Sequence, residues 1–358
     1  MSASSAFIKN CWYVAAWSHE IGEDTLLGRI ITGMPLLFWR DDNGKLVAFE
    51  DRCCHRGAPL SLGRRENTGV RCMYHGMLFD AAGKCIEIPS QDFIPPAARV
   101  RSFPVVERHR WIWVWMGDPA RADAALIPDT HYLDSPQWRG TPGYMHYQAN
   151  YLLIADNLLD FSHLAYVHEK TLGGSAKYAQ IRPKVNRTPR GIRVERWLLD
   201  DEPAPFLKKL KTWPGNVDRW NIYDFVLPGV LLMDSGSAPM NTGAPEGKRV
   251  DAAEFFGCQA ITPETASTSH YFFQQSHNFA LDDPKVTEGL RDAVLAGFKE
   301  DLDMITAQQR MLDLDPDFKM LGLRMDTALG HFRLLVDKVL AEEAREAAAA
   351  KAGAASAA

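Results

Sequence analysis

Two short stretches of the sequence each hold a cysteine and a histidine at a spacing suited to metal binding. The first pairs Cys53 with His55, and the second, after 16 intervening residues, pairs Cys72 with His75. Because the two residue types lie so close in each stretch, they can reach different metal ions. Together they can give one iron two thiolates and a second iron two imidazoles, which is a ligand set of a [2Fe–2S] cluster.

A single zinc ion held by two cysteines and two histidines is the competing interpretation. Zinc sites usually pair like with like along the chain, whereas each stretch here mixes the two residue types. The spacing therefore favours a Rieske type of [2Fe–2S] cluster, held by Cys53, His55, Cys72 and His75. Cys54 is left as a spare thiol beside the cluster, because one short loop cannot easily supply three ligands.

A second group of metal-binding residue types lies at Asp160, His163 and His168. Two imidazoles and one carboxylate form the facial triad that leaves positions open on Fe(II) for oxygen and substrate. Residues five apart on a regular α-helix differ in direction by about 140°, so one straight helical face cannot present both histidines. The spacing predicts a kink, a wide turn or a helix end between them, with Gly173-Gly174 as the exit. The alternative is two unrelated histidines near a bend.

A long C-terminal helix is predicted to begin at Asp283 and Pro284, as an N-cap followed by proline at the first helical position, and to run to about Leu312. Asp301 falls on its apolar stripe and should therefore be buried, where a carboxylate needs a partner. Glu300 and Asp303 point in other directions and are expected on solvated faces. The stripe consists of Val294, Phe298, Asp301, Ile305 and Gln308.

The composition is that of a soluble globular chain. Its 358 residues are 46% hydrophobic and 24% charged, which is enough for two core-forming domains, and the net charge of −5 gives no general attraction to nucleic acid or anionic membranes. No apolar run approaches the roughly 20 residues that span a bilayer, and the N-terminus lacks a signal-peptide pattern. We therefore expect a cytoplasmic protein with neither nucleic acid nor membrane as a partner.

The pattern of elements divides the chain into parts that position the two metal groups. Short apolar runs separated by hairpin turns predict an all-β domain over residues 1–118, with the cluster loops on hairpin ends. Residues 119–142 are rich in Ala, Pro and Asp and read as a linker. Longer strands and two helices predict an antiparallel sheet with helices over residues 143–341, and the Ala-rich residues 342–358 are expected to be disordered.

Together these stretches resemble the oxygenase components of Rieske non-haem iron oxygenases. That family carries Cys-x-His and Cys-x2-His in its cluster domain and Asp-x2-His-x4-His in its catalytic domain, and the chain matches both patterns. It departs from the family at Cys54, where proline is common. Within the family it is similar to vanillate O-demethylase and dicamba monooxygenase subunits, on Asp156–Asp160, Tyr166–His168 and Ile261–Glu264.

The resemblance implies a fold and an iron site. The fold is α+β, with an all-β Rieske domain followed by a catalytic domain whose antiparallel sheet is covered by helices, of the helix-grip or START-like type. The iron site is a mononuclear Fe(II) bound by His163, His168 and Asp301.

The resemblance also implies a route for electrons between subunits. Asp160 would hydrogen-bond His163 in its own subunit and His75 of the partner subunit, with Asn157 in support. A carboxylate in such a position fixes the tautomer of a ligand histidine. Head-to-tail contacts that close give a ring, so a homotrimer is expected.

The activity that the resemblance implies is monooxygenation of an aromatic substrate, most often O-demethylation of a methoxylated aromatic acid with release of formaldehyde. Oxygen is the cosubstrate. NAD(P)H is used by a separate reductase, which carries flavin and a plant-type [2Fe–2S] cluster or works with a ferredoxin, and is not bound by this chain. One alternative is a ring hydroxylase or ring-hydroxylating dioxygenase of an aromatic acid. The other is a Rieske electron carrier without oxygenase activity, and the second metal group argues against it.

The walls of the substrate pocket are predicted to come from the sheet of the catalytic domain. Met233, Asp234 and Gln259 are the candidates, from where the strands align with related enzymes. An Asp234 that faced the pocket would argue against an anionic group of the substrate beside it.

Overall fold

The computed structural model describes residues 6–89, 91–173 and 175–356, and the chain divides into two compact units. The small unit contains residues 9–127 and 262–265, and the large unit contains the rest of the described chain. The division at 127 falls inside the stretch expected to be a linker. The short return of residues 262–265 to the small unit was not anticipated from the sequence.

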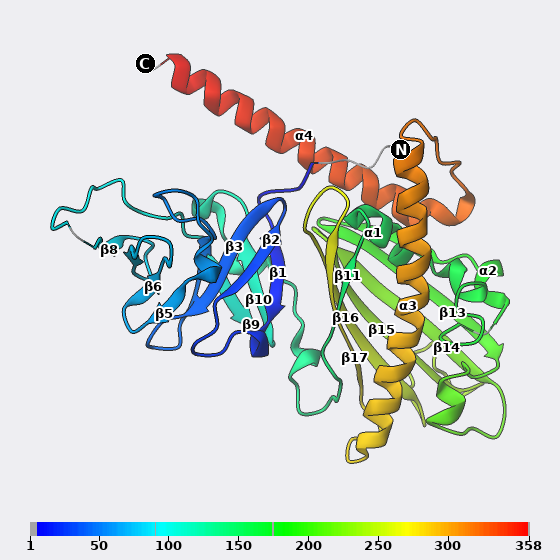
Figure 1. Cartoon of the computed structure of the whole chain (residues 1–358). Helices are drawn as coiled ribbons and strands as arrows, with labels where there is room; N and C mark the ends of the chain where they lie inside the picture. The colour runs from blue at the N-terminus through cyan, green and yellow to red at the C-terminus, as the bar shows by residue number, and fades with distance from the viewer. Residues whose placement is uncertain (1–5, 90, 174, 357–358) are drawn as a thin grey trace. The chain divides into compact units, whose positions relative to one another are not determined.

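Three antiparallel sheets make up the small unit (Figure 1). One strand, β10, carries three tryptophans, and all three are buried: Trp111, Trp113 and Trp115. The strands, in sheet order, are β1 (Trp12–Trp17), β10 (Trp111–Trp115) and β9 (Val105–Arg108); β2 (Leu27–Ile31), β3 (Met34–Arg40) and β4 (Leu46–Glu50); and β5 (Arg64–Glu66), β6 (Gly69–Arg71), β7 (Leu78–Phe79) and β8 (Cys85–Glu87).

The large unit is built on a seven-stranded antiparallel sheet (Figure 1). Long strands with buried side chains on both faces form its centre, and the polar edge strand β12 was not predicted because it lacks an apolar run. The strands, in sheet order, are β11 (Gly143–Tyr147), β17 (Ser269–His277), β16 (Ala253–Pro263), β15 (Val230–Pro239), β14 (Val217–Val226), β13 (Gly191–Asp201) and β12 (Lys184–Thr188).

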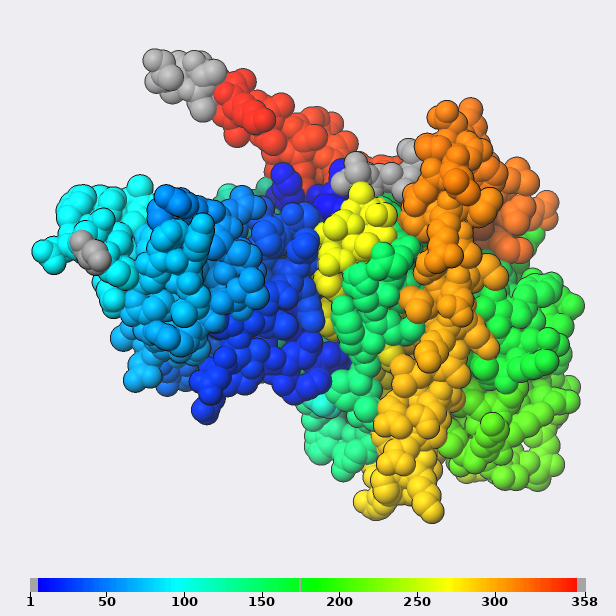
Figure 2. Space-filling model, in the orientation of Figure 1, coloured from blue at the N-terminus to red at the C-terminus, as the bar shows by residue number. Residues whose placement is uncertain are grey.

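Helix α3 (Pro284–Leu314) runs along one face of this sheet, and in Figure 2 its outer side forms part of the surface. Its start is confirmed, since the Asp283 side chain accepts a hydrogen bond from the amide of Lys285. The buried stripe includes Asp301 as predicted, but its last member is Gln309, and Gln308 is exposed.

Two further helices and a series of short turns complete the unit. Helix α1 (Tyr151–Leu159) is joined to α3 by a hydrogen bond of 2.8 Å from the amide of Asn150 to Oε1 of the buried Gln309. Helix α2 spans Lys177–Gln180. The 3-10 helices of the whole chain are η1 (Ser18–Glu20), η2 (Leu60–Leu62), η3 (Pro119–Arg121), η4 (Ala124–Leu126), η5 (His131–Leu133), η6 (Phe161–Ala165), η7 (Leu207–Lys209) and η8 (Arg324–Asp326).

Helix α4 (Thr327–Ser356) corrects the prediction that residues 342–358 are disordered. The helix continues through the Ala-rich stretch to Ser356, because alanine has the highest helix propensity of all residues. Residues 357–358 lie outside the described part of the chain. Within that part, none of the helices has the length and apolarity needed to cross a membrane.

Candidate metal centres

The two loops that carry the cysteine and histidine pairs share one backbone turn. In each loop the amide of the cysteine, Cys53 or Cys72, donates to the carbonyl five residues later at 2.8 Å. The amide of the glycine four residues after it, Gly57 or Gly76, returns to the carbonyl of the cysteine at 2.9 Å. Both glycines have positive φ, 72° and 80°, where a side chain is unfavourable. The paired turns therefore present equivalent positions to one shared group.

The side chains in these loops are suited to a mixed-ligand cluster. Cys53 and Cys72 are buried, whereas His55 and His75 are exposed with their ring centroids 4.5 Å apart. Burial raises the pKa of Cys53 to about 12, and the neighbouring Cys72 adds to the rise. Two thiolates so placed need a cation beside them. The residues fit a Rieske cluster, for which the buried Cys53 and Cys72 would supply the thiolates and the exposed His55 and His75 the imidazoles.

Arg71 braces the second loop from outside. One of its guanidinium nitrogens donates to the carbonyl of Gly76 at 2.6 Å. The same side chain forms ion pairs with Glu66 at 2.7 Å and Glu87 at 2.9 Å. Hydrogen bonds from Arg71 hold the pKa of Glu66 at about 2, well below its usual value. Cys54 is exposed beside the other loop, as a spare thiol.

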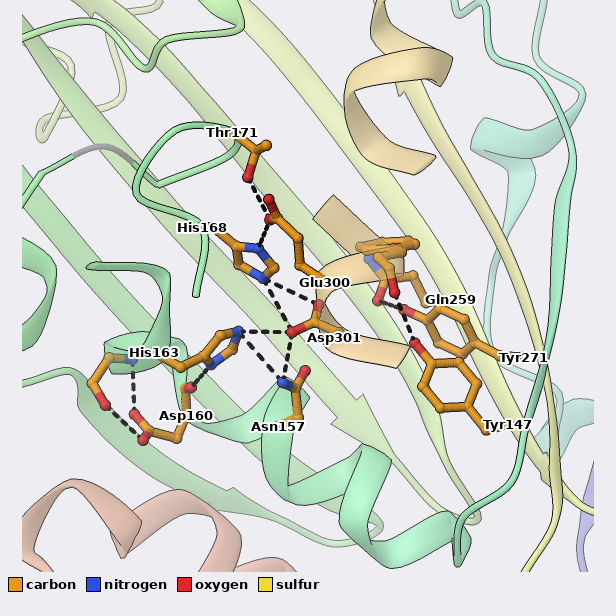
Figure 3. A network of polar contacts seen from close by, with 12 residues as sticks. Tyr147, Asn157, Asp160, His163, His168, Thr171, Gln259, Tyr271, Glu300 and Asp301 are labelled. Carbon is orange, nitrogen blue, oxygen red and sulfur yellow. Dashed lines mark hydrogen bonds and ion pairs between the residues drawn. The ribbon is translucent and has the colours of Figure 1, made fainter. Parts of the chain in front are cut away.

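The second centre brings His163, His168 and Asp301 together, as predicted (Figure 3). Their potential ligand atoms all lie within 4.8 Å of one another. Oδ1 of Asp301 lies 3.1 Å from Nε2 of His168 and 3.5 Å from Nε2 of His163. His168 and Asp301 are buried, with 1% and 5% of their surfaces exposed. Two imidazoles and a carboxylate that converge in this way fit a divalent iron with open positions.

The end of the 3-10 helix η6 explains how two histidines five residues apart can converge. Helix α1 ends at Leu159, His163 lies on the following 3-10 helix η6, and that helix ends at Ala165, before His168. The predicted helix end between the histidines is thus confirmed. Gly173 packs so closely that a Cβ there would lie 2.1 Å from the carbonyl oxygen of Leu164. Gly174, the other half of the predicted exit, lies outside the described residues.

Asn157 holds the carboxylate of the triad. Its Nδ2 donates to Oδ1 of Asp301 at 2.9 Å and lies 3.5 Å from Nε2 of His163 (Figure 3). The sequence interpretation gave Asn157 only a supporting part in the bridge between subunits. In the structure it contacts two members of the triad directly.

The hydrogen bond expected between the Asp160 carboxylate and His163 is not formed, and the main chain of Asp160 takes its place. Nδ1 of His163 contacts the main-chain carbonyl of Asp160 at 2.5 Å (Figure 3). The carboxylate of Asp160 is bound by Ser162 instead. It accepts bonds from the amide at 2.9 Å and the hydroxyl at 2.7 Å, because Asp160 is the N-cap of η6. The bond to His75 of the partner subunit remains a prediction.

Glu300 was predicted on a solvated face, and its side chain is 36% exposed, but the sequence did not indicate that its carboxylate contacts the triad. Its carboxylate accepts a hydrogen bond from Nδ1 of His168 at 2.7 Å and another from the hydroxyl of Thr171 at 2.7 Å. The loop that follows η6 folds over α3 and brings both partners to it (Figure 3). Burial lowers the pKa of His168, but the bonds to Asp301 and Glu300 more than offset this, so the net shift is upward. The adjacent Glu-Asp pair was the available signal in the sequence.

A largely apolar cavity opens beside the triad, between α3 and the sheet. Met233 and Gln259 line it, and Gln259 is held by a hydrogen bond of 2.5 Å from the hydroxyl of Tyr271 (Figure 3). Asp234 was predicted to line the cavity, and this was wrong. Side chains alternate along β15, so that of Asp234 lies on the other face of the sheet. There it accepts a bond from Trp220 at 2.7 Å and pairs with Arg249 at 2.9 Å.

Two family models match the chain. The Rieske [2Fe-2S] domain matches residues 11–104. The vanillate O-demethylase oxygenase C-terminal domain matches residues 147–342. The two matches contain the cluster loops and the triad respectively.

Individual proteins are similar over nearly the whole chain. The iron–sulfur subunit of the toluene-4-sulfonate monooxygenase system of Comamonas testosteroni is 48% identical over 94% of this chain and 98% of its own. A vanillate O-demethylase oxygenase subunit of a Pseudomonas species is 35% identical over 96% and 98%. The crystal structure of dicamba monooxygenase bound to dicamba is 34% identical, covers 95% of this chain and 99% of that one, and has a TM-score of 0.86.

Proposed function

Since this chain belongs to the oxygenase components of Rieske monooxygenases with a vanillate O-demethylase type of catalytic domain, we propose that it hydroxylates a one-carbon substituent of an aromatic acid. The first candidate is a methoxyl group. The observation that carries the proposal is the convergence of His163, His168 and Asp301 at one end of a largely apolar cavity. An electron carrier without oxygenase activity would need neither the triad nor the cavity.

The residues around the triad prepare it to bind metal. Fe(II) held by His163, His168 and Asp301 would supply open positions at which oxygen is activated. Asn157 donates to Asp301 and fixes the direction of its carboxylate. Glu300 accepts from Nδ1 of His168, so that Nε2 of the same ring stays available as a ligand. The apolar side chains of the cavity exclude water from the reacting carbon.

The balanced reaction for a methoxylated acid consumes oxygen, two electrons and two protons. One oxygen atom enters a C–H bond of the methyl group, and the other leaves as water. The resulting hemiacetal loses formaldehyde as its C–O bond breaks, and the phenol remains. The electrons come from NAD(P)H through a reductase, or a reductase and ferredoxin, that delivers them to the cluster held by Cys53, Cys72, His55 and His75.

Transfer from cluster to iron is proposed to cross between subunits of a homotrimer, from His75 of the partner subunit through Asp160. Self-association is supported by apolar side chains that the isolated chain exposes in both units. In the small unit, Tyr74 beside His75 is 60% exposed, and in the large unit Leu321 is 82% exposed. We place the assembly in the cytoplasm, where reduced nicotinamide cofactors are available to the reductase.

Hydroxylation of a methyl group on an aromatic sulfonate is the second candidate. It is favoured by the 48% identity to the toluene-4-sulfonate monooxygenase subunit. The demand on the site is the same, since a methyl group must lie beside the triad while the acid group stays in the cavity. Only the fate of the product differs, because a benzylic alcohol is stable and a hemiacetal is not.

Product analysis tests the proposal. The purified oxygenase, a competent reductase and isotope-labelled oxygen are incubated with 4-methoxybenzoate, toluene-4-sulfonate and benzoate. Formaldehyde and 4-hydroxybenzoate from the first compound support O-demethylation, and a singly labelled benzylic alcohol from the second supports the second candidate. A doubly labelled ring diol would show a dioxygenase, and absence of oxygenated product across methoxylated and methylated acids would overturn the proposal.

A further inference from the structure

We propose that Arg219, which lines the cavity, binds the acid group of the aromatic substrate. This assignment deepens the proposed function and rests on it. An aromatic acid that enters a largely apolar cavity must have its negative charge matched there, because an unpaired buried charge is costly.

Arg219 is placed on the cavity wall as such a partner. Its side chain belongs to β14, and only 5% of the residue is exposed. Among the described residues that line the cavity, it carries the one charged side chain apart from the triad itself. In the register of β14 and β15 it lies opposite Ser237, and two residues along the same face Asn221 lies opposite Ser235. All four line the cavity, so the cation is flanked by neutral hydrogen-bonding groups.

The guanidinium retains donors for a ligand. One Nη donates to the carboxylate of Asp201 at 3.1 Å and the other to the carbonyl of Gly173 at 3.3 Å. These bonds use two of the five N–H groups of the guanidinium. Arg219 makes no other side-chain hydrogen bond with the residues that the structure describes. Asp201 is itself shared, since its other oxygen accepts from Ser175 at 3.0 Å and lies 3.6 Å from Nζ of Lys177.

The guanidinium lies beside the loop that carries His168. It donates to the carbonyl of Gly173, and the amide of Gly173 donates to the carbonyl of His168 at 3.1 Å. Arg219 and the triad also line the same cavity. An acid group bound by Arg219 can therefore belong to a substrate whose one-carbon group lies beside the triad.

Arg196 offers a matched control. It is also buried, with 4% exposed, and its guanidinium carbon lies 5.8 Å from the ring centroid of Tyr178, compared with 5.1 Å for Arg219. Arg196 lines a different hollow, beside Arg182 and Arg324. Removal of either charge therefore disturbs the same aromatic ring, but only Arg219 faces the substrate cavity.

The test measures binding to the iron-loaded holoprotein by titration calorimetry, with 4-methoxybenzoate as the anionic probe and 4-methoxyacetophenone as the neutral one. Arg219→Gln should weaken binding of the anion by about tenfold to hundredfold, as expected for a lost hydrogen-bonded charge. It should change binding of the neutral probe by less than about threefold, and Arg219→Lys should restore part of the selectivity. Arg196→Gln should leave the ratio of the two affinities unchanged.

Equal weakening of both probes in Arg219→Gln, or no change in either, would overturn the assignment. If that variant folds poorly because Asp201 loses its buried partner, the double variant Arg219→Gln, Asp201→Asn removes both charges and must show the same loss of anion selectivity. Selective anion binding without turnover of aromatic acids would refute the proposed function alone. Turnover of aromatic acids with unchanged anion affinity in Arg219→Gln would refute this assignment alone.

Discussion

Glu300 and His168 are joined by a hydrogen bond of 2.7 Å between a carboxylate oxygen and Nδ1 of the ring. The next residue on the same helix, Asp301, lies 3.1 Å from Nε2 of that ring. Consecutive residues of α3 thus hold both nitrogens of one imidazole. This arrangement favours the tautomer with the proton on Nδ1, which leaves Nε2 free to act as a ligand when iron binds.

Replacing Glu300 should weaken iron binding without emptying the cluster. In Glu300→Ala we expect the affinity for the mononuclear iron to fall by about tenfold to hundredfold, because the ring of His168 loses its anchor. Competition with a chelator gives the affinity, and the visible absorbance reports the cluster. Asp303→Ala, on an exposed turn of the same helix, serves as the control. Equal iron affinities in the two variants would show that Glu300 has no orienting role.

Replacing Asp301 should separate the two metal centres. In Asp301→Ala the triad loses its only carboxylate, so we expect mononuclear iron and turnover to be lost while cluster absorbance persists. Iron and acid-labile sulfide per chain, measured together, distinguish loss of one iron from loss of three. Retention of the third iron would mean that another group ligates it.

Asp160 has two roles that substitutions can separate. It is the N-cap of η6, and it is proposed to transfer electrons between subunits. Asparagine is as good an N-cap as aspartate, whereas alanine costs about 1 kcal/mol. Asp160→Asn should therefore keep the melting temperature of the parent protein but slow oxidation of the prereduced cluster by oxygen and substrate. Asp160→Ala should show the same slow oxidation and a lower melting temperature. Rapid oxidation in Asp160→Asn would argue against the bridge.

The two glycines of the cluster loops should differ in their tolerance of alanine. Both have positive φ, so each substitution costs about 1 to 2 kcal/mol from the backbone alone. A Cβ at Gly76 would also lie 2.7 Å from Cγ of Pro89, whereas one at Gly57 would meet nothing closer than 3.8 Å. Thermal denaturation should rank Gly76→Ala below Gly57→Ala. The reverse order would mean that Pro89 moves aside freely.

The sequence predicted well those features that follow from local periodicity. The apolar stripe of α3 placed Asp301 inside, and the angle between residues five apart required a kink, a wide turn or a helix end between His163 and His168, of which the structure has the last. Both arguments depend only on helix geometry. The edge strand β12 (Lys184–Thr188) escaped notice because an exposed edge strand has no apolar run to mark it.

The errors concern contacts that the course of a loop decides. A helical wheel gives the direction of Glu300 from its own axis, but not that residues 166–173 fold over it. The position of Asp160 in the sequence likewise does not tell whether its main-chain carbonyl or its carboxylate contacts His163.

The error at Asp234 is of another kind. Its strand was located correctly, but the face of the sheet on which its side chain lies was assigned wrongly. Met233 and Gln259 fall on the lining as predicted, and their part in binding substrate remains a prediction.

The hydrogen bond between Asn150 and Gln309 has a consequence for how the enzyme matures. It fastens α1 to α3 through groups that are not metal ligands, at a point two turns beyond Asp301. The helices that carry Asn157 and Asp301 are therefore held in position by a contact between protein groups. We therefore expect that iron removed from the triad can be restored without refolding of the chain, because the contact between the two helices does not depend on the metal.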